Sequence, residues 1–431
     1  MAGEPAESNT VRGEAVREAG GRPGGALRDG RETQGGGETQ DGQGLRAGRP
    51  SVAGGQGVLA GQEPVLGRQG VAPGGQGVDA GRAVAPGGHE GQEAEEILAR
   101  ARTSVDPELR RAVEALPTPI RRVALYHFGW EHADGTPAVG DAGKAVRPAL
   151  VLAAARALGG RTEDAVRAAA AVELTHNFTL LHDDVMDRDT TRRHRPTAWT
   201  VFGNADAILV GDALHAQAQR LLAEDPHPAA PAAVARLAQC VVELCAGQST
   251  DVALEGRDPG EVSLDETLTM AEAKTGALLG CACAIGGLFA GADEEEVAAL
   301  DAFGRAAGLA FQLIDDVIGI WGDPARTGKP AGADLAVRKK SLPVVAALAS
   351  GGPAAAELAA LYGPPGQEEE GAAELEAIAL AVERAGGRDW AQAQAAYEMA
   401  RALHELARAV PVPERAGGLL SLAEFVTRRG Y

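Results

Sequence analysis

Two apolar segments with helical periodicity each end abruptly in a cluster of aspartates, and this pattern limits the folds open to the chain. The first segment begins at Glu173 and ends in Asp183, Asp184 and Asp187. Asp183 and Asp187 are four residues apart, so a helix places both on one face. Three carboxylates within five residues repel one another unless a cation lies among them. The apolar residues before them favour a buried helix over a solvated acidic helix end, so we predict an internal cation site.

The second segment, residues 311–319, contains Asp315 and Asp316. Gln312 shares a helix face with Asp315. Carboxylate oxygens with room for water suit Mg²⁺, which proteins bind with one or two carboxylates plus substrate phosphates. Two inward-facing acidic clusters on separate helices can hold a polyanion through bridging metal ions. The two segments together therefore predict a magnesium-dependent site for a phosphorylated substrate.

Residues 94–431 read as long, Ala-rich helices separated by Gly-, Pro- and acid-rich breaks. Aromatic residues make up only 3% of the chain, which disfavours a β-rich fold. Asp106 and Pro107 look like the cap and first residue of a helix, and Leu109, Val113 and Leu116 follow at helical spacing. No segment alternates convincingly as a strand. We predict one all-α helix-bundle domain over residues 94–431.

Residues 1–93 differ from the rest of the chain, because they contain no Phe, Trp or Tyr. Of the 58 glycines, 25 fall within residues 1–90. Such a segment cannot bury enough apolar surface to offset its chain entropy, so we predict a disordered extension. The sequences GGQGV and VAPGG each occur twice in it. The extension is thus either a low-complexity linker or a carrier of repeated docking peptides.

The formal net charge of −19 argues against a nucleic-acid-binding protein. An anionic substrate must then be held by local Lys and Arg residues or by metal ions. The four cysteines match no zinc-ligand spacing and are too few for a disulfide framework, so we expect buried thiols in a reducing compartment. No uncharged apolar run reaches about 18 residues, and the N-terminus has no apolar signal region. We expect a cytoplasmic protein without a membrane span.

Basic residues occur in short groups within the predicted bundle. Lys144 and Arg147 share one helix face, and Arg192 and Arg193 follow the first aspartate cluster. Singly these are ordinary surface charges, but beside two metal clusters they suit two diphosphates, with Arg as a bidentate donor and Lys as a point charge. The later members of this set are Lys274, Lys329 and Lys339.

In this order and spacing, the motifs resemble the trans-polyprenyl diphosphate synthase family over essentially all of residues 94–431. They are GKxxRP (143–148), DDxxD followed by RR (183–193), GQxxD (247–251), KT (274–275), FQxxDD (311–316) and GKxxGxDL with a downstream Lys and Pro (328–343). The resemblance implies an isoprenoid synthase-type helix bundle with a central apolar cavity, commonly a homodimer. It also implies a prenyltransferase that joins isopentenyl diphosphate to an allylic diphosphate.

The resemblance assigns roles residue by residue. The positions that match catalytic residues are Asp183, Asp184, Asp187, Asp315, Asp316 and Lys274. The positions that match Mg²⁺ ligands are Asp183, Asp187 and Asp315, with three ions when substrate is bound. The isopentenyl diphosphate site matches Lys144, Arg147, His176 and Arg193. The allylic diphosphate site matches Arg192, Lys274, Lys329 and Lys339, assisted by Thr275 and Gln312.

Two positions depart from the family pattern. Gly319 stands where the second motif normally ends in a third Asp, and His194 stands where many members have Gly. Phe178 lies five residues before Asp183, and DDxxD carries no insertion, which resembles short-chain enzymes. An aromatic side chain there would close the product tunnel, so we expect geranylgeranyl diphosphate as product, with farnesyl diphosphate next. The simpler alternative is that Phe178 is a core residue.

The N-terminal extension resembles the disordered segments that load polyprenyl synthases into encapsulin-type protein shells, which would locate the enzyme inside a nanocompartment. Two rival functions use the same motifs. A class I terpene cyclase would carry an Asn/Ser/Glu triad where Asp315 and Asp316 stand, and it would not need an isopentenyl diphosphate site. A non-catalytic subunit of a heteromeric synthase usually lacks the first aspartate motif, which is intact here.

Overall fold

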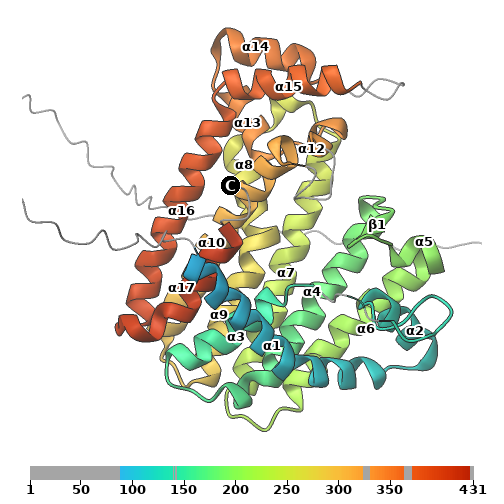
Figure 1. The fold of residues 1–431 in the computed structure, drawn as a ribbon, viewed down its shortest axis with the longest axis vertical. Helices are drawn as coiled ribbons and strands as arrows, with labels where there is room; N and C mark the ends of the chain where they lie inside the picture. Colours follow the sequence, from blue (N-terminus) through green and yellow to red (C-terminus); the bar gives the residue numbers. More distant parts are fainter. Residues whose placement is uncertain (1–87, 139, 141–142, 324–330, 364–370, 428–431) are drawn as a thin grey trace, which may run out of the picture. The chain divides into compact units, whose positions relative to one another are not determined.

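A computed structural model of the chain describes residues 88–138, 140, 143–323, 331–363 and 371–427. These residues are predominantly helical, and their one sheet is a hairpin of β1 (Thr191–Arg192) and β2 (Arg195–Pro196). The predicted all-α class is confirmed (Figure 1). Of the predicted extension, residues 1–87 lie outside the described residues, and residues 88–93 already belong to the first helix.

The helices follow one another closely along the chain. The first half contains α1 (Gly88–Glu114), α2 (Thr118–His127), α3 (Val146–Ala157), η1 (Thr162–Ala165), α4 (Val166–Met186), α5 (Ala198–Phe202), α6 (Asn204–Ala223) and α7 (Ala230–Glu255). The central part contains η2 (Pro259–Glu261), α8 (Leu264–Ala271), η3 (Glu272–Gly276), α9 (Ala277–Phe289) and α10 (Glu294–Trp321). The last part contains α12 (Ala333–Ala336), α13 (Leu342–Ala349), α14 (Gly352–Leu361), α15 (Ala372–Arg384), α16 (Gly387–Ala409) and α17 (Pro413–Thr427).

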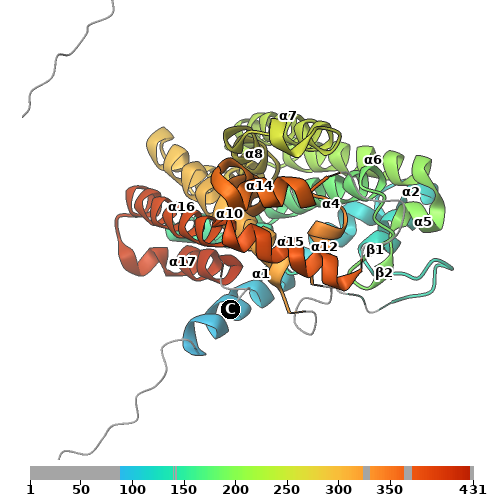
Figure 2. The same ribbon diagram turned by 90° about the horizontal axis from the view of Figure 1, so that it is seen from above.

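Helix α10 is the centre of the bundle. It packs most extensively against α16 and α9, while α4 packs against α6 and α3 against α9. Figure 2 shows α7 on one side of α10 and α17 on the other. Asp293 caps the start of α10 by accepting from the Glu296 amide, and the Glu296 side chain accepts from the Asp293 amide in return. This capping box satisfies two amides that the helix itself cannot pair.

Helix α4 owes its central position to small apolar side chains. Ala168, Ala169, Ala170 and Ala171 are all fully buried, so neighbouring helices approach α4 on every side. A helix that is apolar all round is a core helix. Of the aspartates at its C-terminal end, Asp184 is buried, Asp183 is half-buried and Asp187 is exposed.

The expected helix start at Asp106 is wrong. Helix α1 begins at Gly88 and continues through Pro107 to Glu114. Buried residues recur at one face on both sides of the proline, with Val105 1% and Leu109 2% exposed. Burial of this continuous face outweighs the single helical hydrogen bond that Pro107 cannot donate.

Three described helices are long and apolar enough to cross a membrane by length and composition alone. They cover Ala230–Glu255, Leu264–Phe289 and Glu294–Trp321, and the buried share of their most apolar window is 39%, 61% and 67%. The second and third pack against each other in the bundle, so their hydrophobicity serves the core of the domain. Helix α7 keeps a larger part of its apolar surface exposed.

Candidate active site

The first aspartate cluster lies where α4 ends. Asp187 follows the last helical residue, and its amide donates to the carbonyl of Asp183 at 2.8 Å. Asp184 is 1% exposed, whereas Asp187 is exposed. Burial raises the pKa of Asp183 to about 6; Lys274 opposes this rise, and the charge of Asp187 adds to it. Burial is therefore the main reason why the Asp183 carboxylate is harder to ionise than a free one.

Asp184 and Arg192 form a pair within this cluster. The Nε and Nη2 atoms of Arg192 lie 2.7 and 2.6 Å from Oδ1 of Asp184. The other carboxylate oxygen of Asp184 is buried and has no hydrogen-bond partner. Burial raises the pKa of Asp184 although Arg192 lowers it. Asp184 therefore fixes the position of the Arg192 guanidinium within the cluster.

The β1–β2 hairpin that follows α4 contains Arg193, the second arginine of the Arg192–Arg193 motif. Arg193 and His194 form its two-residue turn, and both have positive φ, at +51° and +61°. Arg195 fixes the hairpin by donating to the carbonyls of Tyr126 and Glu131 at 3.0 and 3.2 Å. A turn with positive φ at both central residues is type I′, which favours Asn-Gly. This explains why Gly suits position 194 and why His194 is strained there.

The second aspartate cluster faces the same region from α10. Asp316 is 4% exposed, and it accepts hydrogen bonds from Nε2 of Gln312 at 2.8 Å and from the Leu342 amide at 3.0 Å. Thr275 donates to the other end of the Gln312 amide at 2.7 Å. Asp315 is exposed. As at the first cluster, one aspartate is buried and hydrogen-bonded, and its neighbour is more accessible.

Lys274 lies in a short π-helical turn, η3, between α8 and α9. Its ammonium is 2.6 Å from Oδ2 of Asp251 on α7. Gly247 makes this possible, because a Cβ there would lie 2.8 Å from the Lys274 backbone nitrogen. Burial alone would lower the pKa of Lys274, but Asp251 and Asp183 outweigh it and raise the pKa. Lys274 is therefore charged and electrostatically coupled to the first cluster.

Lys339 couples the two clusters. Its ammonium lies 3.8 Å from carboxylate oxygens of both Asp316 and Asp334. The same charge lowers the pKa of Asp187 on the other wall, although burial raises that pKa overall. Asp315 is among the carboxylates that raise the pKa of Lys339. Both aspartate clusters thus lie within electrostatic reach of one ammonium group.

A third group of basic residues lies near the middle of α4. Burial and the charges of Arg147, Arg193 and Arg192 hold the pKa of His176 well below its usual range, so its imidazole is neutral at neutral pH. Lys144 approaches the ring of Phe425 on α17, with 5.6 Å between Nζ and the ring centroid. Lys144 does not share a helix face with Arg147, because α3 begins only at Val146 and its N-cap Ala145 has left-handed backbone angles. Lys329 lies outside the described residues.

Beneath this group is a buried polar network that sequence reasoning missed. The side-chain amide of Asn177 donates to Glu173, with 3.3 Å between Nδ2 and Oε1, and its oxygen is 3.1 Å from Nε2 of His127. Burial and the nearby arginines lower the pKa of His127 to about 3. The sequence signal for this network is Asn177, a polar residue one helical turn after Glu173 within an apolar run. The network keeps a neutral imidazole and a carboxylate below the arginines.

The described carboxylates fit a hydrated divalent cation that also binds substrate oxygens. Among the residues that the structure describes, no three His, Cys, Asp or Glu side chains could hold a metal ion by themselves. Mg²⁺ is usually bound by one or two carboxylates, with water and phosphate completing its shell. The raised pKa of Asp183 and the unpaired oxygen of Asp184 leave room for added positive charge.

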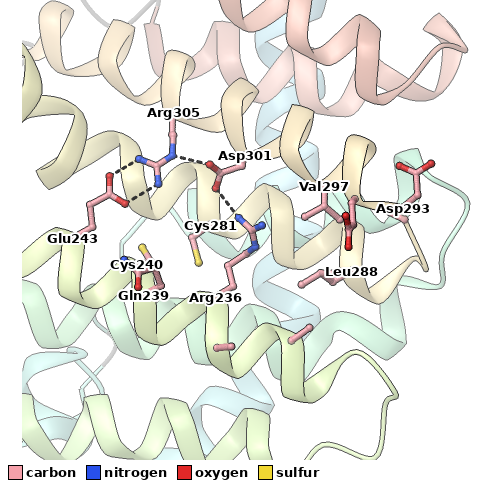
Figure 3. A pocket seen from close by; sticks show the side chains of 14 residues that line it. Arg236, Gln239, Cys240, Glu243, Cys281, Leu288, Asp293, Val297, Asp301 and Arg305 are labelled. Carbon is pink, nitrogen blue, oxygen red and sulfur yellow. Dashed lines mark hydrogen bonds and ion pairs between the residues drawn. The ribbon is translucent and has the colours of Figure 1, made fainter. Parts of the chain in front are cut away.

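A pocket of about 630 Å³ between α7, α9 and α10 contains none of the predicted site residues. Figure 3 shows its ion pairs: Arg305 binds Glu243 at 2.5 and 2.8 Å and Asp301 at 2.7 Å, and Arg236 binds Asp301 at 3.1 Å. These charges already neutralise one another. We interpret the group as a tie between α7 and α10 rather than a catalytic site.

Comparison with known proteins gives a consistent result. The sequence profile of the family described as polyprenyl synthetase matches residues 136–380. The chain is 50% identical over 334 residues to a geranylgeranyl diphosphate synthase of Mycobacterium tuberculosis, covering 77% of this chain and 93% of that protein. It is 44% identical over 335 residues to a (2E,6E)-farnesyl diphosphate synthase of Mycobacterium bovis, covering 77% and 92%.

Solved structures agree. A polyprenyl synthetase from Streptomyces coelicolor A3(2) superimposes with a TM-score of 0.73 at 47% identity, covering 77% of this chain and 98% of that one. A geranylgeranyl pyrophosphate synthetase from Pyrococcus horikoshii superimposes with a TM-score of 0.69 at 30% identity, covering 78% and 98%.

The strained turn gives a stability prediction. His194→Gly should raise the free energy of unfolding by about 1 kcal/mol, because glycine adopts positive φ without the steric cost that a Cβ brings. Urea unfolding at neutral pH measures the change. The control is His132→Gly, at an exposed turn residue without positive φ, which should give no gain. Equal effects at both positions would contradict the assignment of strain to His194.

The raised pKa of Asp183 gives a prediction about pH and metal. Its folded-state pKa of about 6 lies above the ordinary 3.8, so the folded metal-free protein binds the extra proton. The Asp183 contribution to the free energy of unfolding should therefore fall, by at most about 3 kcal/mol, as pH rises from 4 through 6.

Mg²⁺ should in turn raise the melting temperature more at pH 8 than at pH 5, because it competes with protons at this cluster. Thermal unfolding with Mg²⁺ and with a chelator measures this, and Asp183→Asn should reduce the difference between the two pH values. An effect of Mg²⁺ that is the same at both pH values and in the variant would exclude Asp183 from the cation site.

Proposed function

Because this chain belongs to the polyprenyl synthetase family and is a short-chain trans-prenyltransferase, we propose that it joins isopentenyl diphosphate to an allylic diphosphate to make geranylgeranyl diphosphate. The observation that carries this proposal is that the Lys339 ammonium, 3.8 Å from Asp316 of the second cluster, also acts electrostatically on Asp187 of the first. Such an arrangement suits a ligand with several negative charges that must be released as a leaving group. The second-ranked product is farnesyl diphosphate.

We assign the allylic diphosphate to the space between the two clusters. Lys274 and Lys339 remain protonated at neutral pH, because neighbouring carboxylates raise the pKa of each. Both can therefore act as fixed positive charges toward a diphosphate. Arg192, now bound to Asp184, can turn one of its remaining N–H groups to the same diphosphate. Lys329 completes the proposed set by resemblance only.

We assign isopentenyl diphosphate to the basic group near the middle of α4. Arg147 and Arg193 both act on the half-buried His176 imidazole, which supports their closeness to one another. A neutral His176 can donate one hydrogen bond to a phosphate oxygen without adding charge. Lys144, beside Phe425, would contribute from the edge of this site near the last described helix. The two diphosphates would thus bind to separate groups of cations.

Asp183 and Asp187 from α4 and Asp315 from α10 would hold Mg²⁺, with three ions when substrate is bound. Bound Mg²⁺ supplies positive charge that neutralises the diphosphate leaving group. The chain's own part is to orient that diphosphate with Lys274 and Lys339 and to keep water away with the buried apolar faces of α4, α9 and α10. Removing one such fixed charge typically slows a reaction about 100- to 1000-fold.

The carbon chemistry then needs no protein nucleophile. The allylic C–O bond breaks as the diphosphate takes the electron pair, and the isopentenyl double bond attacks the resulting cation. The new C–C bond leaves a cation on the isopentenyl unit, which loses a proton to the departed diphosphate. The role of the bundle is to position both partners and to shield the cation from water.

We propose that Phe178 limits product length. Its ring is 8% exposed and makes an edge contact with His182 and a tilted contact with His215, with ring centroids 5.3 and 5.2 Å apart. Phe178 lies on the α4 face one turn before His182 and five residues before Asp183. This cluster of rings can act as the floor beneath the allylic site. His215 on α6 is a further candidate that its sequence position alone could not suggest.

The proposed reaction and the floor are tested together. Purified protein is incubated with Mg²⁺, radiolabelled isopentenyl diphosphate and each of three primers (dimethylallyl, geranyl and farnesyl diphosphate), and the dephosphorylated products are separated by chromatography. The wild type should yield chiefly the C20 alcohol. Phe178→Ala should shift the products to longer chains while turnover persists, because the ring no longer blocks growth.

Phe289→Ala is the matched control, since it also removes a buried ring that contacts a histidine, His227, but at the far end of α9. It should leave product length unchanged. The floor assignment fails if Phe178→Ala keeps the wild-type product or if both variants lengthen it equally. Absence of any labelled product from the wild type would overturn the proposed reaction.

We also propose that the enzyme is a cytoplasmic homodimer that residues 1–93 load into an encapsulin-type shell. Support for the dimer is the exposed apolar surface of α6 and α7, where Leu209 is 56% and Val242 64% exposed. Sedimentation should give a dimer that Leu209→Asp with Val242→Asp converts to monomer. Deleting residues 1–87 should spare activity and dimerisation but abolish co-purification with a co-expressed shell protein. Retained co-purification would contradict the loading role.

A further inference from the structure

The short segment before α3, which contains Lys144, has an unfavourable backbone. Gly143 has a φ of +106° and Ala145 a φ of +54°. Glycine adopts positive φ without steric cost, whereas the Cβ of an alanine makes the left-handed conformation unfavourable. Lys144 lies between these two residues, so contacts from outside the segment are needed to fix its position.

Helix α1 supplies such a contact through Arg102. Its Nη2 atom donates a hydrogen bond to the Gly143 carbonyl, although the two residues are 41 positions apart in the sequence. Arg102 is half-buried, and α1 packs against both α3 and α4 (Figure 1). The Arg193 guanidinium also lies against Gly143, since a Cβ built on this glycine would be 2.6 Å from Nη2 of Arg193. Arg102 therefore holds the residue that directly precedes Lys144.

Asp106 lies one turn after Arg102 on α1 and extends this contact toward α4. Burial raises the pKa of Asp106, and the charge of Arg102 opposes that rise. Burial also raises the pKa of Glu173 on α4, and Arg147 and Arg193 oppose it. The charge of Asp106 adds to the rise at Glu173, so the two carboxylates are within electrostatic reach of each other. A continuous set of charges thus links α1 to the two arginines proposed to bind isopentenyl diphosphate.

These residues of α1, of α4 and of the segment before α3 meet at one cavity of about 380 Å³. Its lining includes Arg102, Asp106, Gly143, Ala145 and Glu173. Arg102 and Asp106 lie before residue 136, where the match to the family profile begins, so neither belongs to the matched part of the chain. Asp106, expected from sequence to cap a helix, instead lies within α1 and lines this cavity.

We propose that Arg102 is a positioning residue for the binding of isopentenyl diphosphate. By holding the Gly143 carbonyl, Arg102 keeps Lys144 at the edge of the basic group near the middle of α4. Asp106 orients the Arg102 guanidinium from one turn away. The allylic diphosphate, which we assign to the space between the two aspartate clusters, does not depend on this contact. This inference rests on the proposed function, since it concerns the second substrate of the same reaction.

The two substrates can be tested separately by isothermal titration calorimetry. Isopentenyl diphosphate is titrated into protein saturated with Mg²⁺ and a non-ionisable allylic thiolodiphosphate, so that no reaction occurs. Arg102→Met should raise the Kd for isopentenyl diphosphate about 10-fold, because a charge-assisted hydrogen bond is lost. Arg102→Lys should stay within about 3-fold of wild type, because lysine can still donate to the carbonyl. The Kd for the thiolodiphosphate should change less than about 2-fold in both variants.

The role of Asp106 is tested by a double variant. Asp106→Asn should raise the Kd for isopentenyl diphosphate about 2-fold, as expected for the loss of one ion pair between residues a helical turn apart. Arg102→Met with Asp106→Asn should bind no more weakly than Arg102→Met alone, because both residues act through one contact. Fully additive losses would exclude Asp106 from this role.

Arg100→Met is the matched control, since Arg100 is an exposed arginine of α1 whose partner Glu96 lies 3.5 Å away on the same helix. It should leave both Kd values unchanged. Unchanged isopentenyl diphosphate binding in Arg102→Met would overturn the proposal, as would an equal loss of affinity for both ligands. If Arg102→Met does not fold, Arg102→Gln, which also lacks the charge, replaces it with the same expectation. Wild-type turnover in the radiolabelled assay tests the proposed function by itself, so the two failures are distinguishable.

Discussion

The structure depends on one electrostatic constraint: carboxylates at the inner ends of buried helices must be neutralised. Burial raises the pKa of Asp183, and the charges available nearby are Arg192, which is tied to Asp184, and Lys274, which is tied to Asp251. The cluster therefore remains short of positive charge. A polyanion that brings its own divalent cations supplies the missing positive charge, so this feature favours a phosphorylated substrate.

The two aspartates of each neighbouring pair differ in burial and in hydrogen bonding. Asp184 and Asp316 are buried and bound to Arg192 and to Gln312, respectively, whereas Asp183 is half-buried and Asp315 is exposed. A buried, hydrogen-bonded carboxylate gives a rigid support, and the more accessible one can meet a metal ion or a phosphate. The ion pairs around Arg305 make a useful contrast, because there every charge already has a partner and nothing remains to attract a ligand.

Much of the fold and of the site could be predicted from sequence, because the signals are local. Helical periodicity gives the all-α class, and spacing along α4 and α10 gives the faces of Asp183 and Gln312. The predicted helix start at Asp106 was wrong because packing on both sides of Pro107 overrides the tendency of proline to break a helix. The contact of Arg102 with Gly143 could not be predicted, because it arises from tertiary packing of distant segments. The π-helical turn at Lys274 could not be predicted for the same reason.

In the proposed complex, one diphosphate is held between metal ions bound to both α4 and α10. The most direct measurement is a crystal structure with Mn²⁺ and a non-ionisable thiolodiphosphate analogue of the allylic substrate, with metals located by anomalous scattering. We expect Mn²⁺ on Asp183 and Asp187 and also on Asp315, with all ions touching the same diphosphate. Metal on one wall alone, or a diphosphate bound without contact to Lys274 and Lys339, would contradict it.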